Sequence, residues 1–146
     1  MPTSLHKKAI IALCILGGFA PQIKAQRTLT VFCRPGAQEM VSAYMWDTTD
    51  EAPSFPGGES ELIRFINRER KYPREAYEAG IQGRVRCSFI VDVDGSILDI
   101  SINRGFHEAF NHEAVRIIRQ MPRWRPGTIN GVPVPTLYML TIPFRL

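Results

Sequence analysis

Two His-Glu pairs, His107-Glu108 and His112-Glu113, are the residues of this chain that come nearest to the chemistry of a zinc hydrolase. The zinc motif HExxH places its histidines four residues apart, so that both imidazoles lie on one face of a helix. Here the two histidines are five residues apart. The pairs therefore predict solvated residues around the start of a helix, and no metal site.

Other patterns that could bind a ligand are also incomplete. Asp92, Asp94 and Gly95 resemble part of a calcium loop, but no glutamate follows at the twelfth loop position. Gly80-x-x-Gly83 lacks the further glycines and the lysine of a phosphate-binding loop. No order of residues suggests a nucleophile with its base. We expect no catalytic residue, no metal and no cofactor, and interpret the chain as a protein that is not an enzyme.

The N-terminal 25 residues have the pattern of an export signal. Residues 6–8 are His-Lys-Lys, residues 9–20 are uncharged and apolar, and Ala25 offers a small residue for cleavage. The apolar run is shorter than the roughly 20 residues that a membrane-spanning helix needs. We expect residues 1–25 to be a signal peptide that directs export to the periplasm, with a short uncleaved inner-membrane anchor as the alternative.

Cleavage after residue 25 would change the charge balance. The full chain has a formal net charge of +4, and Lys7, Lys8 and Lys24 would leave with the signal, so that 15 basic and 14 acidic side chains remain. A net charge near +1 argues against a nucleic-acid partner. The basic run from Arg64 to Arg74 indicates a solvated helix face or a surface for an acidic partner or phospholipid headgroups.

Two of the three cysteines, Cys33 and Cys87, would remain in the mature protein. An exported protein can form a disulfide between them. Cys87 alternates in phase with Val85, Phe89 and Val91, however, which favours a small buried hydrophobic residue. The sequence leaves both interpretations open.

The spacing of apolar residues divides the rest of the chain into residues 26–54, a linker with short strands, and one domain over residues 55–146. A helix should begin near Glu59 with Leu62, Ile63, Phe65 and Ile66 on its apolar side, and end at Tyr72-Pro73. A short helix over residues 74–79 should follow.

Residues 85–93 alternate as a half-buried strand, and Asp94-Gly95 predicts a two-residue hairpin turn. The return strand should place Leu98, Ile100 and Ile102 on one face. A further helix is expected to start at Asn111 as its N-cap and to stop at Pro122. Trp124 should fill the bottom of the core.

The last strand, residues 134–146, carries two prolines of the same parity, Pro135 and Pro143. Proline lacks an amide hydrogen, so the side of the strand that these positions face should have no neighbouring strand. The free donors between them would be Leu137, Met139 and Thr141. This edge has two interpretations: proline protects it from aggregation, or it accepts an extended peptide by strand addition.

A series of short motifs occurs in a definite order along the domain. They are Tyr72-Pro73, Gly80 and Gly83, Asp94-Gly95, the block MPRWRPG over residues 121–127, Asn130-Gly131 and the ending IPFRL. This order resembles the C-terminal domain of TonB, in particular its Bacteroidetes-type versions. The resemblance covers residues 53–146. It implies an α+β fold in which a three-stranded antiparallel sheet with a β-β-α-β core has helices packed on one face.

The resemblance also implies a partner and a site. The partner would be the TonB-box peptide of TonB-dependent outer-membrane receptors, bound beside the final strand in support of energised transport. The residues expected to contact it are Val134, Thr136, Leu137, Tyr138, Met139, Leu140, Thr141, Ile142, Lys71, Tyr72 and Pro73.

Two departures from the family pattern concern coupling to the inner-membrane motor proteins. Ser4 and His6 do not reproduce the Ser-x-x-x-His element of the TonB membrane helix, and residues 68–71 are charged where glutamines are common. An alternative is therefore an envelope interaction or structural module with this fold and no motor coupling. A free edge would also allow a homodimer through the final strand.

Overall fold

The computed structural model describes residues 28–33, 36 and 40–146. The expected signal segment and the side chain of Cys33 lie outside the described residues. The elements are, in chain order, β1 (Thr28–Cys33), β2 (Met40–Met45), α1 (Glu59–Glu69), α2 (Arg74–Glu78), β3 (Gly83–Val91), β4 (Ile97–Arg104), α3 (Glu108–Arg119), β5 (Gly127–Ile129), β6 (Val132–Val134) and β7 (Thr136–Phe144). No described helix is long and apolar enough to span a membrane.

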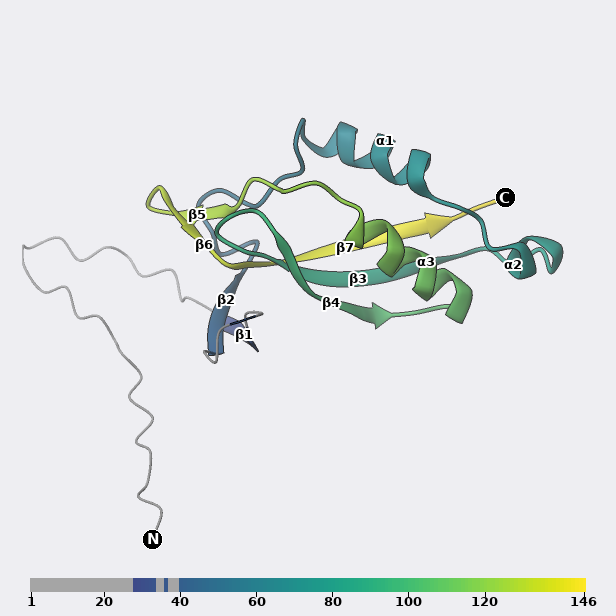
Figure 1. The fold of residues 1–146 in the computed structure, drawn as a ribbon, viewed down its shortest axis with the longest axis horizontal. Helices are drawn as coiled ribbons and strands as arrows, with labels where there is room; N and C mark the ends of the chain where they lie inside the picture. The colour runs from purple at the N-terminus through teal and green to yellow at the C-terminus, as the bar shows by residue number, and fades with distance from the viewer. Residues whose placement is uncertain (1–27, 34–35, 37–39) are drawn as a thin grey trace, which may run out of the picture.

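The sheet of this α+β fold has five strands in the order β1-β2-β7-β3-β4, and β5 and β6 form a separate two-stranded sheet (Figure 1). The three antiparallel strands β7, β3 and β4, with α3 between β4 and β7, form the expected β-β-α-β core. The expectation of three strands is too low, because β1 and β2 extend the sheet beyond β7. They come from residues 26–54, where the sequence predicts a linker with short strands, but the weak hydrophobic pattern there does not show that these strands join the sheet.

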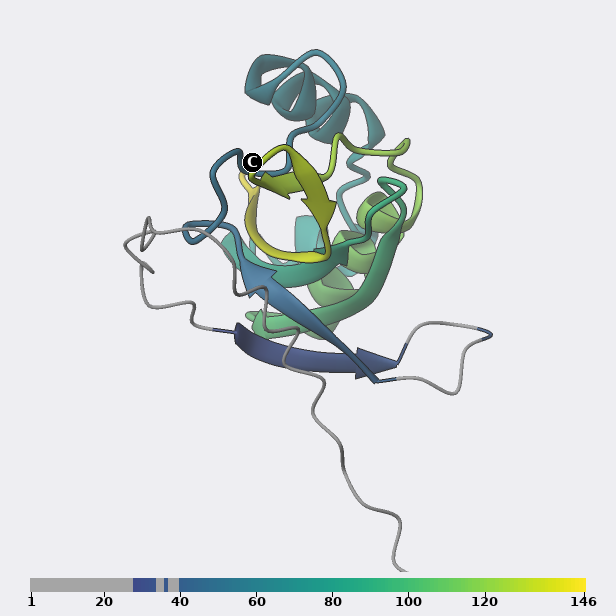
Figure 2. The same ribbon diagram turned by 90° about the vertical axis from the view of Figure 1, so that its left-hand side faces the viewer.

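Helices α1 and α3 cover one face of the curled sheet (Figures 1 and 2). The strand β3 presents Val85, Cys87, Phe89 and Val91 to that core, as its alternation predicts. At one end of the core Trp124, 3% exposed, packs edge-on against the rings of Phe55 and Phe89. The role of this tryptophan as a core residue is confirmed.

The connection between β3 and β4 is longer than the sequence predicts. The hairpin closes with the Asp92 amide donating to the Ser96 carbonyl, and the Gly95 amide donates to the Asp92 carbonyl. Only Gly95 has a positive φ, of 83°, whereas a two-residue turn of the predicted kind needs positive φ at both central positions. The two-residue turn is therefore wrong. Val93 lies in this loop and is 42% exposed, so it does not belong to the strand.

The return strand β4 does not keep one apolar face. Asp99 has a φ of 51°, and the register between β3 and β4 shifts at this point. Such an irregularity reverses the alternation of side chains along a strand. Ile100 and Ile102 consequently pack on the helix-side core, whereas Leu98 packs on the opposite face.

The helix α3 begins earlier than predicted. His107 is its N-cap, with Nδ1 accepting a hydrogen bond from the Ala109 amide. Asn111 lies inside the first turns, and its amide group packs so closely on Gly105 that a side chain on that glycine would clash. The predicted N-cap at Asn111 is therefore wrong. The imidazole of His107, four residues earlier, already accepts the backbone hydrogen bond that an N-cap side chain accepts.

The other face of the sheet is half covered. Ala43 of β2 and Ile90 of β3 are fully buried there, and Val41, Leu98 and Leu137 pack around them. The strands β1 and β2 pass beneath β3 and β4 of the curled sheet, on the side away from α1 (Figure 2). We call this surface the back face of the sheet.

Candidate docking groove

The final strand is divided at Pro135. Val134 ends β6, where it pairs with Gly127 of β5, and the Asn130-Gly131 turn joins these two short strands. Both turn residues have positive φ, of 51° and 74°, as a tight hairpin turn requires. The single strand expected from residue 134 onward is therefore shorter, and β7 runs over Thr136–Phe144.

The parity of the two prolines correctly identifies the outward side of β7. The Tyr44 amide donates to the Pro135 carbonyl at 2.9 Å, and the Trp46 amide donates to the Leu137 carbonyl at 3.2 Å. These odd-numbered groups therefore point away from β3, which pairs with β7 along its whole length on the other side.

The outward side is open only in part. The strand β2 runs parallel to β7 and pairs with Thr136 and Leu137. In the part of the chain that the structure describes, no strand pairs with Met139 or Thr141 on this outward side. The expectation that the Leu137 amide is a free donor is therefore wrong. The strand β2, which precedes the predicted domain, pairs with β7 at this residue.

An apolar groove of about 450 Å³ lies along this open stretch, between β7 and α1. Its walls are formed by Glu59, Leu62, Ile63, Ile66, Asn67, Tyr138, Met139, Leu140, Thr141 and Pro143. Ile63 is 52% exposed and Met139 39% exposed, although both are apolar. The contribution of α1 is not predicted from the sequence, but Ile63 carries a signal, since it widens the apolar stripe of α1 beyond what the core buries.

The two ends of the groove differ in charge. At one end, Glu59 begins α1 near Tyr138. The pKa of the Tyr138 phenol is raised, mainly by burial and secondly by the negative charge of Glu59. At the other end the Arg70 guanidinium donates to the Pro143 carbonyl at 2.5 Å. Arg70 thereby satisfies the last outward carbonyl of β7, and the open backbone is confined to Met139 and Thr141.

The even-numbered residues expected at the site have other roles. The side chain of Tyr138 packs against Phe89 and Trp124, and Leu140 and Ile142 are buried in the same core. Thr136 is fully buried, and its hydroxyl donates to the Val134 carbonyl. These residues support the strand, and Tyr138 and Leu140 contribute part of the groove wall.

The structure does not bring Lys71, Tyr72 and Pro73 to the groove wall. The Tyr72 ring packs edge-on against Phe110 and Phe144, and its hydroxyl donates to the Ile81 carbonyl. The segment is an anchor for the connection between α1 and α2.

An ion pair holds the same connection to α3. The Lys71 amide donates to Glu113 Oε1 at 2.7 Å, and Arg116 contacts both Glu113 oxygens, at 2.6 and 2.8 Å. Arg116 also donates to the Glu69 carbonyl. Partial burial opposes ionisation of Glu113, but the hydrogen bonds from Arg116 and Lys71 outweigh it and hold the pKa of that carboxyl below its usual value.

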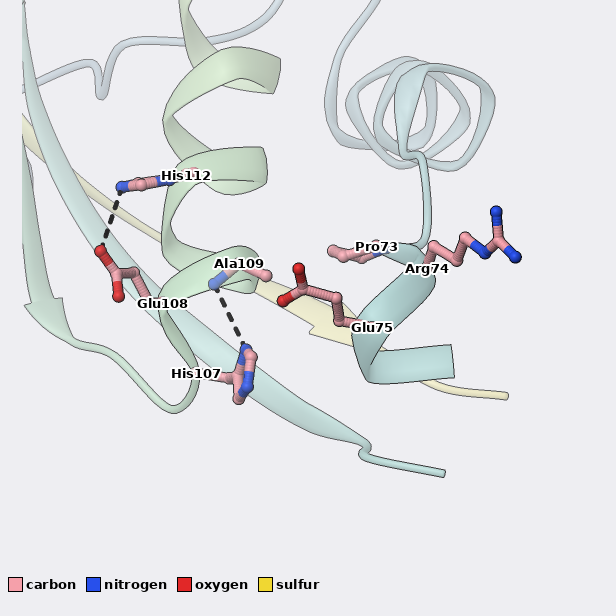
Figure 3. A pocket seen from close by; sticks show the side chains of 7 residues that line it. All are labelled: Pro73, Arg74, Glu75, His107, Glu108, Ala109 and His112. Atoms are coloured by element: carbon pink, nitrogen blue, oxygen red, sulfur yellow. Dashed lines mark hydrogen bonds and ion pairs between the residues drawn. The ribbon is translucent and has the colours of Figure 1, made fainter. Parts of the chain in front are cut away.

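A larger recess, of about 600 Å³, lies between the first turns of α2 and α3 (Figure 3). Its two histidines do not converge: His107 Nδ1 accepts from the Ala109 amide, and His112 Nε2 lies 3.8 Å from a Glu108 oxygen. Within the described residues, no three side chains of the types that ligate metals form a group. We therefore assign no chemistry to this recess.

An open backbone edge beside an apolar groove offers main-chain donors and acceptors to an added strand. Residues 68–146 match the family described as Gram-negative bacterial TonB protein C-terminal. The chain belongs to this family.

Individual proteins named TonB are similar to part of this chain. The chain is 29% identical over 100 residues to the protein TonB of Helicobacter pylori. The matched region covers 63% of this chain and 36% of that protein. It is 26% identical over 95 residues to the protein TonB of Pseudomonas putida, covering 60% and 39%. The chain thus spans little more than a third of the length of these relatives. The NMR structure of the Helicobacter pylori TonB C-terminal domain is similar at 24% identity and a TM-score of 0.47, covering 58% of this chain and 89% of that one.

Proposed function

We propose that this protein works in the periplasm, where it docks the TonB-box peptide of TonB-dependent outer-membrane receptors by adding the peptide as a strand to β7. It thereby supports energised transport across the outer membrane, together with inner-membrane motor proteins. Membership of the TonB C-terminal family supports the choice of partner.

The observation that carries this proposal is the open stretch at Met139 and Thr141, flanked by β2 at one end and by Arg70 at the other. Strand addition derives its affinity from main-chain hydrogen bonds, and an exposed sheet edge supplies these donors and acceptors. The short length of the open stretch limits the bound segment to a few residues.

The groove would supply the specificity. Alternate side chains of an added strand point to opposite faces of the sheet. Those on the helix side would enter the groove between β7 and the apolar residues Leu62, Ile63 and Ile66 of α1. A peptide with apolar residues at every second position fits this arrangement.

The decisive variant is Met139→Pro, compared with Met139→Ala. The Met139 amide points away from β3, so proline removes a free donor and leaves the internal ladder in place. Alanine shortens the side chain and keeps the donor. We expect at least a tenfold loss of peptide affinity for the proline variant, since the proline ring also obstructs the approaching strand, and a smaller loss for the alanine variant.

The measurement is a backbone NMR titration with TonB-box peptides of the host's own receptors. Shifts concentrated on residues 137–141 and on the groove side of α1 would support docking at this edge. Absence of shifts at millimolar peptide, with the wild-type chain folded, would overturn the proposal. Concentration-dependent shifts of the same residues without peptide would indicate that a second copy occupies the edge.

A further inference from the structure

Three exposed arginines occupy neighbouring positions in the paired strands β3 and β4. Arg84 and Arg86 are two residues apart on β3, and Arg104 ends β4. In the sheet register Arg86 is directly opposite both Arg104 and Thr141, and Arg84 is opposite Pro143. All three arginines are exposed. We call them the back-face arginines.

This arrangement is unfavourable in the isolated domain. Like charges at directly opposed positions of an antiparallel pair destabilise a sheet. Arg86 and Arg104 occupy such positions. An anion held between them would remove the repulsion.

Several other arginines of the domain have acidic partners. Arg64 pairs with Glu61 at 2.6 Å, Arg74 with Glu78 at 2.7 Å, and Arg116 with Glu113. Among the described residues, Arg84, Arg86 and Arg104 form no ion pair and no side-chain hydrogen bond. The basic run from Arg64 to Arg74 is thus largely a self-paired helix face, whereas the back-face arginines keep their charges available.

The spacing of the three residues fits a phosphate group. Neighbouring positions across the strands are about 5 Å apart and alternate residues along a strand about 6.6 Å apart. Three guanidinium groups on this triangle can converge on one tetrahedral anion, and the guanidinium fork matches phosphate oxygens. The groove beside β7 and the recess between α2 and α3 are lined by other residues, and exposed side chains on the face of a sheet suit a flat anionic layer more than an extended peptide.

We propose that the back-face arginines bind the phosphate headgroups of an anionic membrane surface. The exposed neighbours on the same face of β7, Thr141 opposite Arg86 and Met139 opposite Ser88, carry no charge that would oppose this contact. This inference does not rest on peptide docking, because it uses the face of the sheet and not its edge.

The test compares the full-length chain with two triple variants that lose the same charge. The first is Arg84→Gln with Arg86→Gln and Arg104→Gln. The matched control is Arg119→Gln with Arg123→Gln and Arg125→Gln, three exposed arginines on and after α3. Co-sedimentation with phosphatidylglycerol vesicles measures the anionic contact, and phosphatidylcholine vesicles give the background from the apolar N-terminal segment.

Each basic residue at an anionic membrane surface changes the affinity about fivefold, so the first variant should bind phosphatidylglycerol vesicles on the order of 100-fold more weakly. The control variant should lose no more than about threefold, because its arginines would lie beyond roughly one Debye length of the surface. Circular dichroism should show the first variant folded and no less stable than the wild type, since the Arg86–Arg104 repulsion is removed.

Two results would overturn the proposal. Equal losses in both variants would mean that net charge alone directs binding. Binding of a soluble glutamate-rich peptide that depends on the back-face arginines, without binding to phosphatidylglycerol vesicles, would assign the surface to an acidic protein segment.

Discussion

Gly95→Ala tests whether the loop between β3 and β4 is held by the core residue that it contacts. Gly95 has a φ of 83°, and a Cβ at this position would lie 2.0 Å from the Trp124 carbonyl oxygen. The Trp124 amide also donates to the Gly95 carbonyl at 2.8 Å. The substitution therefore acts on the backbone of a buried tryptophan as well as on the turn.

The expected cost has three parts. An alanine in the left-handed region costs roughly 1 kcal/mol. Moving the Trp124 backbone away weakens its hydrogen bond, worth about 0.5–1.5 kcal/mol. Repacking the indole against Phe55 and Phe89 adds about 1–3 kcal/mol. The sum, about 2.5–5.5 kcal/mol, is a large share of the typical stability of a domain.

Gly131→Ala provides the matched control. Gly131 also has a positive φ in a hairpin turn, of 74°, but a Cβ there would have no atom within 4 Å. Only the conformational cost of roughly 1 kcal/mol should apply. The difference between the two variants isolates the contact with Trp124.

The assay is urea denaturation followed by far-ultraviolet circular dichroism, with thermal melting as a second measure. The excess cost of Gly95→Ala, about 1.5–4.5 kcal/mol, should lower Tm by about 6–36 °C more than Gly131→Ala, using about 4–8 °C per kcal/mol for a domain of this size. Equal free energies of unfolding for the two variants, within about 0.5 kcal/mol, would refute the reasoning, because they would show that Trp124 adjusts freely.

Two further outcomes follow from buried groups. The Cys87 thiol is free and fully buried, and burial raises its pKa to about 11. Iodoacetamide at pH 8 should therefore leave Cys87 unmodified in the folded chain and label it in urea, with peptide mass mapping to separate it from Cys14 and Cys33. Rapid labelling of Cys87 without denaturant would contradict this packing. The pKa of Glu113 is lowered in the folded state, so its pairing with Arg116 stabilises the protein above the ordinary glutamate pKa of about 4.3 and is lost as the pH falls through the folded value. Glu113→Gln should therefore reduce the free energy of unfolding at pH 7 by about 1–2 kcal/mol. This difference from the wild type should shrink below about pH 4. A difference that is constant between pH 7 and pH 3 would show that the charge of Glu113 is not the cause.

Local errors in the sequence interpretation have a common origin. Asn111 and Asp94-Gly95 are good capping and turn residues by type, yet the helix begins at His107 and the turn is a longer loop. More than one residue can supply the same local hydrogen bond, and tertiary contacts choose between them. The close approaches at Gly105 and Gly95 are such contacts, and neither is visible in the local pattern.

The sequence by itself determined the features that depend on period and parity. Alternation along residues 85–91 identified the buried face of β3, and the shared parity of Pro135 and Pro143 identified the outward side of β7. These follow from strand geometry, which fixes the direction of every second side chain and every second amide. The order of the motifs was sufficient to identify the family.

Only the tertiary structure decided how much of the edge is open and what lies beside it. The strand β2, more than 90 residues before β7, covers Leu137, while α1 builds the groove and Lys71, Tyr72 and Pro73 turn to α3 instead. The three back-face arginines become neighbours only when β3 and β4 pair in register. Each of these is a contact between segments distant in the chain, and their free energy depends on how surfaces fit together, which local periodicity does not encode.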